Sequence, residues 1–160
     1  HVAAMREAGF LRRRAPLPAA CASGSFVAPT LVTLDRLDRL DREVFGPVLH
    51  VVEWEARDLD ALVDAINARG YGLTLGVHSR IDATIAQIAR RARVGNLYVN
   101  RNMIGAVVGV QPFGGEGLSG TGPKAGGPHT LARYAVERTL TVNTAAAGGN
   151  AELLAGLSAH

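Results

Sequence analysis

The chain has 160 residues, of which 48% are hydrophobic and 19% charged, which is enough for one globular domain with a buried core. Its net charge is +3, carried mostly by Arg, and only 5% of its residues are aromatic, so its basic clusters lack the interleaved rings typical of nucleic-acid binding. No apolar run approaches the ~20 residues that span a bilayer, and the first residues lack the pattern of a signal peptide. Because the chain begins without Met and inside a helical pattern, we expect it to be a piece of a longer protein.

The first part of the chain predicts short elements separated by turns. A helix over 2–8 should end at Gly9, because glycine suits the left-handed position that closes a helix. Runs of β-branched residues predict strands. In chain order we expect a strand over 26–34 broken at Pro29, a polar helical turn over 34–42 and a strand over 48–54.

From Asp58 onward, helices and strands alternate. Asp58 should cap a helix that ends near Gly70, and a capping-box-like start over 79–82 should open a second helix. Strands are expected over 73–78 and 96–100. This order predicts βαβ units, a mainly parallel sheet and the α/β class, with ligands at the carboxyl ends of the strands. The inward residues of the helices are expected to be Leu59, Leu62, Val63 and Ile66 in the first, and Ile81, Ile85, Ile88 and Ala92 in the second.

A glycine-rich segment follows the last of these strands, with nine glycines between Gly105 and Gly127. Such density indicates a chain that turns at positive φ or passes close to another group. Its apolar residues suggest a shaped wall, in which Phe113 packs on the methylenes of a substrate. Backbone amides at Gly105 and Ala106 could hold an anion. A packed surface loop is an equally good interpretation of the residues alone.

Two phosphate-binding patterns nearly match this segment, and we reject both. Gly115-Glu-Gly117-Leu-Ser-Gly120 fits G-x-G-x-x-G, but the residues over 121–128 cannot open the helix that this motif requires. The segment from Gly117 to Lys124 also resembles a phosphate loop. There Pro123 precedes Lys124, and Ala125 stands where the Mg²⁺-binding hydroxyl belongs.

Three further features of the sequence bear on cofactor binding, nucleophilic chemistry and metal binding. In Glu43-Val-Phe45-Gly-Pro, the carboxylate could accept the hydroxyls of a ribose and the ring could pack on a heterocycle, although an acidic loop with a core Phe is the simpler alternative. The single Cys21 excludes an internal disulfide, and we interpret it as a small hydrophobe because nothing nearby would activate a thiolate. The five histidines lack metal-ligand spacing, so no metal site is expected.

After this segment, the pattern predicts a short helix over 130–137, a strand over 138–143 and a tail of small residues. Together the motifs of the chain resemble a known family. In order they are Glu43-Val-Phe-Gly-Pro-Val48, Gly70-Tyr-Gly-Leu-Thr74, Gly95-Asn-Leu-Tyr-Val-Asn100, Gln111-Pro-Phe-Gly-Gly115 and Leu118-Ser-Gly120. This order resembles the NAD(P)-dependent aldehyde dehydrogenase superfamily. The longer run over 100–128 resembles the L-glutamate γ-semialdehyde (1-pyrroline-5-carboxylate) dehydrogenase modules of the bacterial proline utilization A family.

The resemblance implies roles for five residues. Glu43 corresponds to the carboxylate that binds the nicotinamide ribose, and Phe45 to the ring beside it. Gly105 and Ala106 correspond to the loop that anchors the α-carboxylate of the substrate, and Phe113 to an aromatic wall of the aldehyde pocket. The implied cofactor is NAD, and FAD is implied only for a proline dehydrogenase domain outside this chain.

The resemblance also implies an organisation. Residues 1–137 would be the C-terminal part of the catalytic domain, 138–144 an oligomerisation-flap strand that supports a homo-oligomer, and 145–160 a tail. The nucleophilic Cys, general-base Glu, oxyanion Asn and Rossmann half of the family lie upstream of these motifs. We therefore expect no catalytic residue here and no activity from this chain alone. The parent is expected in the cytoplasm, with peripheral membrane association left open.

Two alternatives remain open at this stage. The parent could be a dehydrogenase for another semialdehyde, or the chain could be a non-catalytic remnant that only binds or oligomerises. If the parent is a dehydrogenase, whether for L-glutamate γ-semialdehyde or for another semialdehyde, the expected partner is a small-molecule semialdehyde.

Overall fold

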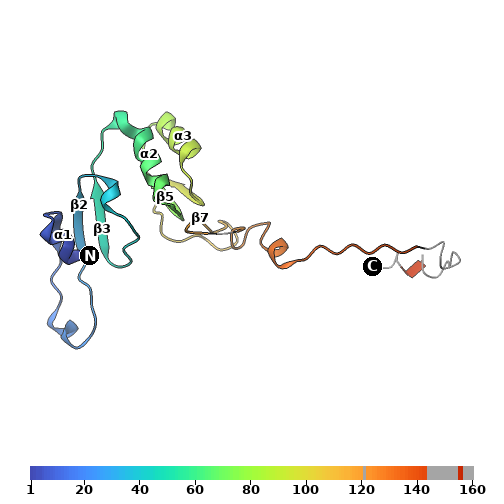
Figure 1. Ribbon diagram of the computed structural model, residues 1–160, viewed down its shortest axis with the longest axis horizontal. Helices are drawn as coiled ribbons and strands as arrows, with labels where there is room; N and C mark the ends of the chain where they lie inside the picture. The colour runs from blue at the N-terminus through green and yellow to red at the C-terminus, as the bar shows by residue number, and fades with distance from the viewer. Residues whose placement is uncertain (121, 144–154, 157–160) are drawn as a thin grey trace. The chain divides into compact units, whose positions relative to one another are not determined.

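The computed structural model describes residues 1–120, 122–143 and 155–156 (Figure 1). By its contacts the chain divides into two units, residues 1–130 and 131–160. The helices of the described part are α1 (Val2–Glu7), α2 (Leu59–Ala68) and α3 (Asp82–Arg91). Its strands are β1 (Leu11–Arg14), β2 (Thr30–Leu34), β3 (Val48–Val52), β4 (Tyr71–Gly72), β5 (Thr74–Val77), β6 (Asn96–Val99) and β7 (Glu116–Gly117). None of the helices in this part is long and apolar enough to cross a membrane.

The first helix ends as its sequence predicts. Gly9 follows α1 with φ of +79°, and its N–H donates to the Arg6 carbonyl at 3.0 Å. The Phe10 N–H donates to the Met5 carbonyl at 2.9 Å. These two bonds form a Schellman motif, which satisfies carbonyls at the end of the helix and turns the chain into β1.

A three-stranded sheet occupies the N-terminal part of the first unit, in the order β1-β2-β3. β2 pairs antiparallel with β1 and parallel with β3, with Thr30 opposite Val48 and Leu34 opposite Val52. The expected strand over 26–34 forms only after Pro29. β2 is the central strand of this sheet, and its alternate residues Thr30, Val32 and Leu34 are buried. β1 was not predicted, since three consecutive arginines conceal its strand character.

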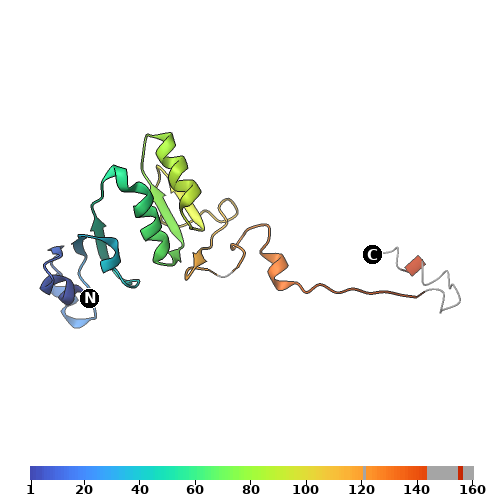
Figure 2. The same cartoon turned by 45° about the horizontal axis from the view of Figure 1, so that its top comes forward.

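A βαβ unit forms the second half of this unit, as predicted. β5 and β6 pair in parallel, with Thr74 opposite Asn96 and Val77 opposite Val99, and α3 is the crossover. Figure 2 shows α2 and α3 side by side, and Arg91 of α3 pairs with Asp64 of α2 at 2.5 Å. This hydrogen bond lowers the pKa of Asp64. The contact is exposed, so it orients the two helices more than it stabilises them.

The parallel pairing expected from the sequence is present in β2–β3 and β5–β6, but the expectation of one sheet is wrong. The strands form three separate sheets, β1-β2-β3, β4-β7 and β5-β6, and the pairs β1–β2 and β4–β7 are antiparallel. Alternation along the chain specifies the order of the elements, but it does not specify which strand edges meet. Here β3 pairs with β2 and β5 with β6, so the helix between β3 and β5 does not connect neighbouring strands.

The two predicted helix caps are only partly correct. Asp58 occupies the N-cap position of α2, but its side chain makes no capping bond. The N-cap of α3 is Ile81, whose N–H donates to Ser79 Oγ at 3.1 Å. The backbone of Ser79 is bonded on both sides by the Asn100 amide, at 3.0 and 2.9 Å. This contact draws Ser79 toward β6, so the capping box does not form and Ile81 is exposed rather than inward.

The other inward residues behave as expected, with Leu59 and Val63 buried and Leu62, Ile66, Ile85, Ile88 and Ala92 half-buried. In the second unit the expected helix over 130–137 is reduced to a 3₁₀ turn, η4 (Leu131–Tyr134). The predicted strand over 138–143 is not confirmed, because these residues form neither helix nor strand. A strand exists only through hydrogen bonds to another strand. The predicted tail over 145–160 lies outside the described residues except for 155–156.

Substitution at the centre of the first sheet should reduce stability. Val32 has no exposed surface, whereas Val27 is 57% exposed. We expect Val32→Ala to lower the free energy of unfolding by about 2 kcal/mol, because buried methyl groups leave a cavity. Denaturant unfolding of the gene product that carries this sequence measures the change. Val27→Ala is the matched control, and equal losses in the two variants would contradict this assignment of the core.

Candidate functional site

The glycine-rich segment leaves the carboxyl end of β6 and folds back against the turn between α2 and β5. Its strand β7 pairs antiparallel with β4, with Tyr71 opposite Gly117. Phe113 and Ala125 form a bridge, with N–H to carbonyl distances of 3.0 and 2.9 Å. Backbone hydrogen bonds therefore join the segment to itself at Phe113 and Ala125, and to the rest of the first unit at β4.

Glycines in the segment and next to it are needed because backbones cross there without room for a side chain. A Cβ on Gly95 would overlap the carbonyl oxygen of Gly114. A Cβ on Gly117 would lie 2.5 Å from the carbonyl oxygen of Gly70. Gly105 and Gly109 differ, because their φ angles are +71° and +79° and their Cβ positions are open. Both causes expected from the sequence are thus present, each at different positions.

The side chain of Asn96 on β6 forms hydrogen bonds with the glycine-rich segment. This residue is 8% exposed, and its Nδ2 donates to the Pro112 carbonyl at 3.1 Å. Its Oδ1 accepts from the Gly114 N–H at 3.4 Å and from Lys124 Nζ at 3.4 Å. Lys124 also donates to the Gly95 carbonyl. The two residues that flank Phe113 are therefore bonded to one buried amide.

Tyr98, two residues further along β6, contacts the expected anion loop. Its hydroxyl donates to the Gly105 carbonyl at 3.4 Å and accepts from Asn96 Nδ2 at 3.3 Å. In a trans peptide the carbonyl and the next N–H point in opposite directions. Since the Gly105 carbonyl faces Tyr98, the Ala106 N–H is directed away from β6. The Arg101 guanidinium lies 4.4 Å from the centre of the Tyr98 ring, so a cation is held beside this loop.

Glu43 lies on a cleft of about 480 Å³ in the first unit. The cleft is lined on one side by the loop before β3 and on the other by residues that include Arg69, Tyr71 and Ser119. Arg69 Nη1 donates to the Leu40 carbonyl at 3.1 Å. Its Nε is the one buried side-chain nitrogen or oxygen in the described part that has no hydrogen-bond partner. The cleft is therefore lined by both a carboxylate and a guanidinium.

His50 also lines this cleft, and burial lowers its pKa. Its Nε2 lies 2.8 Å from the Nε2 of His1. One of the two rings must accept this hydrogen bond, which a neutral imidazole can do. The lowered pKa favours a neutral His50 at pH 7, so the fixed charges of the cleft come from the acidic and arginine residues.

The five residues singled out from the sequence do not converge in one cavity. Glu43 lines the cleft together with Ser119 of the glycine-rich segment, whereas Phe45, Gly105, Ala106 and Phe113 do not line it. Phe45 is 96% exposed, so the alternative of a core phenylalanine is wrong. Phe113 is half-buried, and the loop at Gly105 is exposed.

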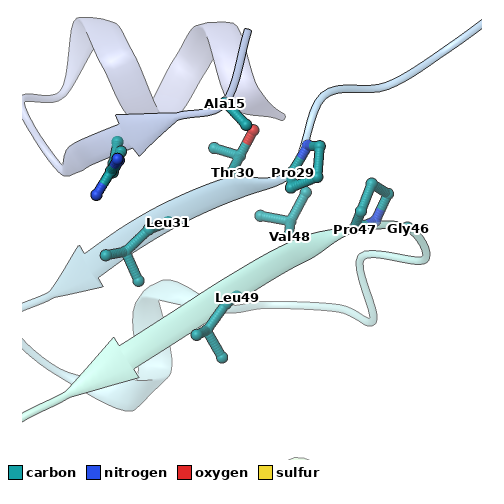
Figure 3. Close-up of a pocket in the computed structure, with 9 residues that line it drawn as sticks. Ala15, Pro29, Thr30, Leu31, Gly46, Pro47, Val48 and Leu49 are labelled. Atoms are coloured by element: carbon teal, nitrogen blue, oxygen red, sulfur yellow. The ribbon is translucent and has the colours of Figure 1, made fainter. Parts of the chain in front are cut away.

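A second, apolar cavity of about 570 Å³ opens at the first sheet (Figure 3). Leu31 and Leu49, paired in register on β2 and β3, project from the same face of the sheet. Gly46 and Pro47 also line it, but none of the five singled-out residues does. With few polar groups, this cavity offers no evident chemistry. Cys21 lies on η1 (Ala19–Ser23), in the loop between β1 and β2, and lines neither cavity.

Sequence reasoning did not single out Asn96, Tyr98 and Lys124 as site residues. A signal for the first two exists, because polar groups at alternate positions of a buried strand share one face. Nothing local marks Lys124, whose contacts are 28 and 29 residues away.

Comparison with known proteins agrees with this architecture. Residues 7–140 match the model of the aldehyde dehydrogenase family, and the chain belongs to that family. The α/β class is confirmed.

Within the family, the chain is similar to proteins of proline catabolism. It is 70% identical over 115 residues to the Bifunctional protein PutA of Klebsiella aerogenes, covering 72% of this chain and 9% of that protein. A crystal structure of bifunctional proline utilization A (PutA) superposes with a TM-score of 0.82 at 59% identity, over 92% of this chain and 15% of that one. The 1-pyrroline-5-carboxylate dehydrogenase from Thermus with bound NAD superposes with a TM-score of 0.65 at 37% identity, over 79% and 25%. The chain thus spans a small part of each relative.

The backbone crossing at Gly95 should be intolerant of any side chain. We expect Gly95→Ala to destabilise the gene product by at least ~3 kcal/mol, since the new methyl group displaces the Gly114 carbonyl. Gly109→Ala is the control for backbone strain alone, at about 1–2 kcal/mol, because its φ is +79° with open space around it. Denaturant unfolding compares the two. A Gly95 variant no less stable than the Gly109 variant would contradict the crossing.

Proposed function

We propose that this chain is the C-terminal part of the catalytic region of an NAD-dependent L-glutamate γ-semialdehyde (1-pyrroline-5-carboxylate) dehydrogenase of the proline utilization A type. The intact protein would oxidise the semialdehyde to glutamate in proline catabolism. The names of the similar proteins support this substrate. The observation that carries the proposal is the loop after β6, where the Tyr98 hydroxyl turns the Gly105 carbonyl inward and so directs the Ala106 N–H outward.

The Ala106 N–H and the nearby Arg101 guanidinium could together bind a carboxylate. The substrate carries such a group at the end opposite to its aldehyde, so binding it orients the reacting end. Phe113, fixed through its backbone to Ala125, would contact the aliphatic chain between the two ends. An uncharged aldehyde would use the Phe113 contact but not the amide.

NAD is the proposed cofactor, and the residues of the Glu43 loop fit one end of it. Glu43 lines a cleft with room for a ligand, and Phe45 presents an almost fully exposed ring on the same loop. The carboxylate would accept the hydroxyls of a ribose, and the ring would pack on a flat heterocycle. Bound NAD⁺ supplies the hydride acceptor of the reaction. We assign no catalytic residue to this chain and give Cys21 no part in the chemistry.

The substrate preference of the intact gene product tests the proposal. We expect kcat/KM for L-glutamate γ-semialdehyde to exceed that for pentanal, an uncharged aldehyde of the same chain length, by at least ~100-fold. The reason is that a site built for a carboxylate leaves polar groups unpaired when the carboxylate is missing. NADH formation at 340 nm measures both rates. Equal efficiency toward the two aldehydes would contradict the proposed substrate.

The cofactor role of Glu43 gives a separate prediction. In the intact gene product, Glu43→Ala should raise KM for NAD⁺ by about tenfold, because a hydrogen bond to a charged group is worth ~1.5–3 kcal/mol. KM for the aldehyde should stay near the wild-type value. Cys21→Ser is the matched control and should leave turnover nearly intact. A folded Cys21 variant without activity, or an unchanged KM for NAD⁺ in the Glu43 variant, would overturn these assignments.

A further inference from the structure

Lys124 is the only lysine of a chain that has 16 arginines. It is half-buried in the glycine-rich segment, and its ammonium contacts the Gly95 carbonyl and Asn96 Oδ1. Both acceptors lie at the start of β6. An ammonium is a compact point charge with three donors, whereas a guanidinium is a broad planar fork. The narrow space between the crossing backbones at Gly95 and Gly114 suits the smaller group.

The ammonium is one of the contacts that favour a single orientation of the Asn96 amide. Asn96 Oδ1 meets only donors, the Lys124 ammonium and the Gly114 N–H, at 3.4 Å each. Asn96 Nδ2 meets only acceptors, the Pro112 carbonyl at 3.1 Å and the Tyr98 hydroxyl at 3.3 Å. Turning the amide over would oppose like groups at three of the four contacts, because only the Tyr98 hydroxyl can either donate or accept. Lys124 therefore favours the one orientation that bonds both neighbours of Phe113.

Lys124 is itself fixed by its own backbone. Its carbonyl accepts from Thr130 Oγ1 at 2.5 Å and from the Gly127 N–H at 3.0 Å. A Cβ on Gly114 would lie 3.2 Å from Lys124 Cα, so the two backbones pack closely. The next residue, Ala125, forms the bridge to Phe113. The backbone after Lys124 thus bonds Phe113 directly, and the ammonium acts on its two neighbours through Asn96.

We propose that Lys124 is a positioning residue for the aldehyde pocket, acting through Asn96 on the wall at Phe113. This inference rests on the proposed function, in which Phe113 contacts the aliphatic chain of the substrate. It differs from a direct ion pair between the ammonium and the substrate carboxylate. The ammonium already contacts two protein acceptors, the Gly95 carbonyl and Asn96 Oδ1, which argues against such an ion pair.

Steady-state kinetics of the intact gene product separate these two roles. With Lys124→Met we expect KM to rise on the order of 10-fold to 100-fold for both L-glutamate γ-semialdehyde and pentanal, since both chains pack on the same wall. KM for NAD⁺ should not change. Lys124→Arg, which keeps donors on a bulkier group, should recover part of the loss. Tyr98→Phe is the comparison variant, and it should raise KM mainly for the charged aldehyde.

Three kinetic results would overturn the inference. A rise confined to the charged aldehyde would indicate a direct ion pair. Equal losses in every parameter, including KM for NAD⁺, together with a lower Tm, would indicate a purely structural role. Unchanged aldehyde KM values in a folded Lys124→Met variant would leave Lys124 without a positioning role.

Hydrogen–deuterium exchange keeps the inference separate from the proposed substrate. In Lys124→Met we expect faster amide exchange over residues 105–115, with no change in α2 and α3. This readout does not depend on which aldehyde the wild-type protein oxidises. Inactivity of the wild-type protein toward the semialdehyde would therefore defeat the proposed function alone. Unchanged exchange over 105–115 would defeat the role of Lys124 alone.

Discussion

The crossing of the glycine-rich segment over the start of β6 is the constraint on which the rest of the site depends. At Gly95 the two backbones approach so closely that a side chain there would overlap the Gly114 carbonyl. Such proximity leaves polar backbone groups that require partners, and Asn96 supplies them from a buried position. The loop at Gly105 and the wall at Phe113 follow from this arrangement, since Gly105 and the two neighbours of Phe113 are bonded to side chains of β6.

The two candidate regions differ in how completely this chain forms them. The region after β6 is built from residues of the chain itself, with hydrogen bonds from Asn96 and Tyr98 to the loop backbone. The Glu43 loop instead presents an exposed ring and one rim of a cleft. An aldehyde dehydrogenase of which this chain represents a small part would complete the cofactor region with other segments. The proposed substrate region is therefore more completely formed by this chain than the proposed cofactor region.

Much of the local structure could be predicted, and the errors have physical causes. Periodicity located α2, α3 and β6, because an apolar face or a β-branched run is a local property. β1 was missed because its arginines are exposed while its backbone pairs with β2. The capping box failed because the Asn100 amide, 21 residues away, bonds the Ser79 backbone. The strand over 138–143 was expected from its residues, but a strand requires a partner edge that sequence does not identify.

The sequence by itself determined the family, the order of most of the elements and the place of the glycine-rich segment after the last parallel strand. Those properties reside in motifs and spacing, which are local. Only the tertiary structure decided which carbonyl each glycine faces, how the Asn96 amide is turned and what Lys124 contacts. These depend on where distant backbones cross, and hydrogen bonds between such segments have no signature in either segment alone.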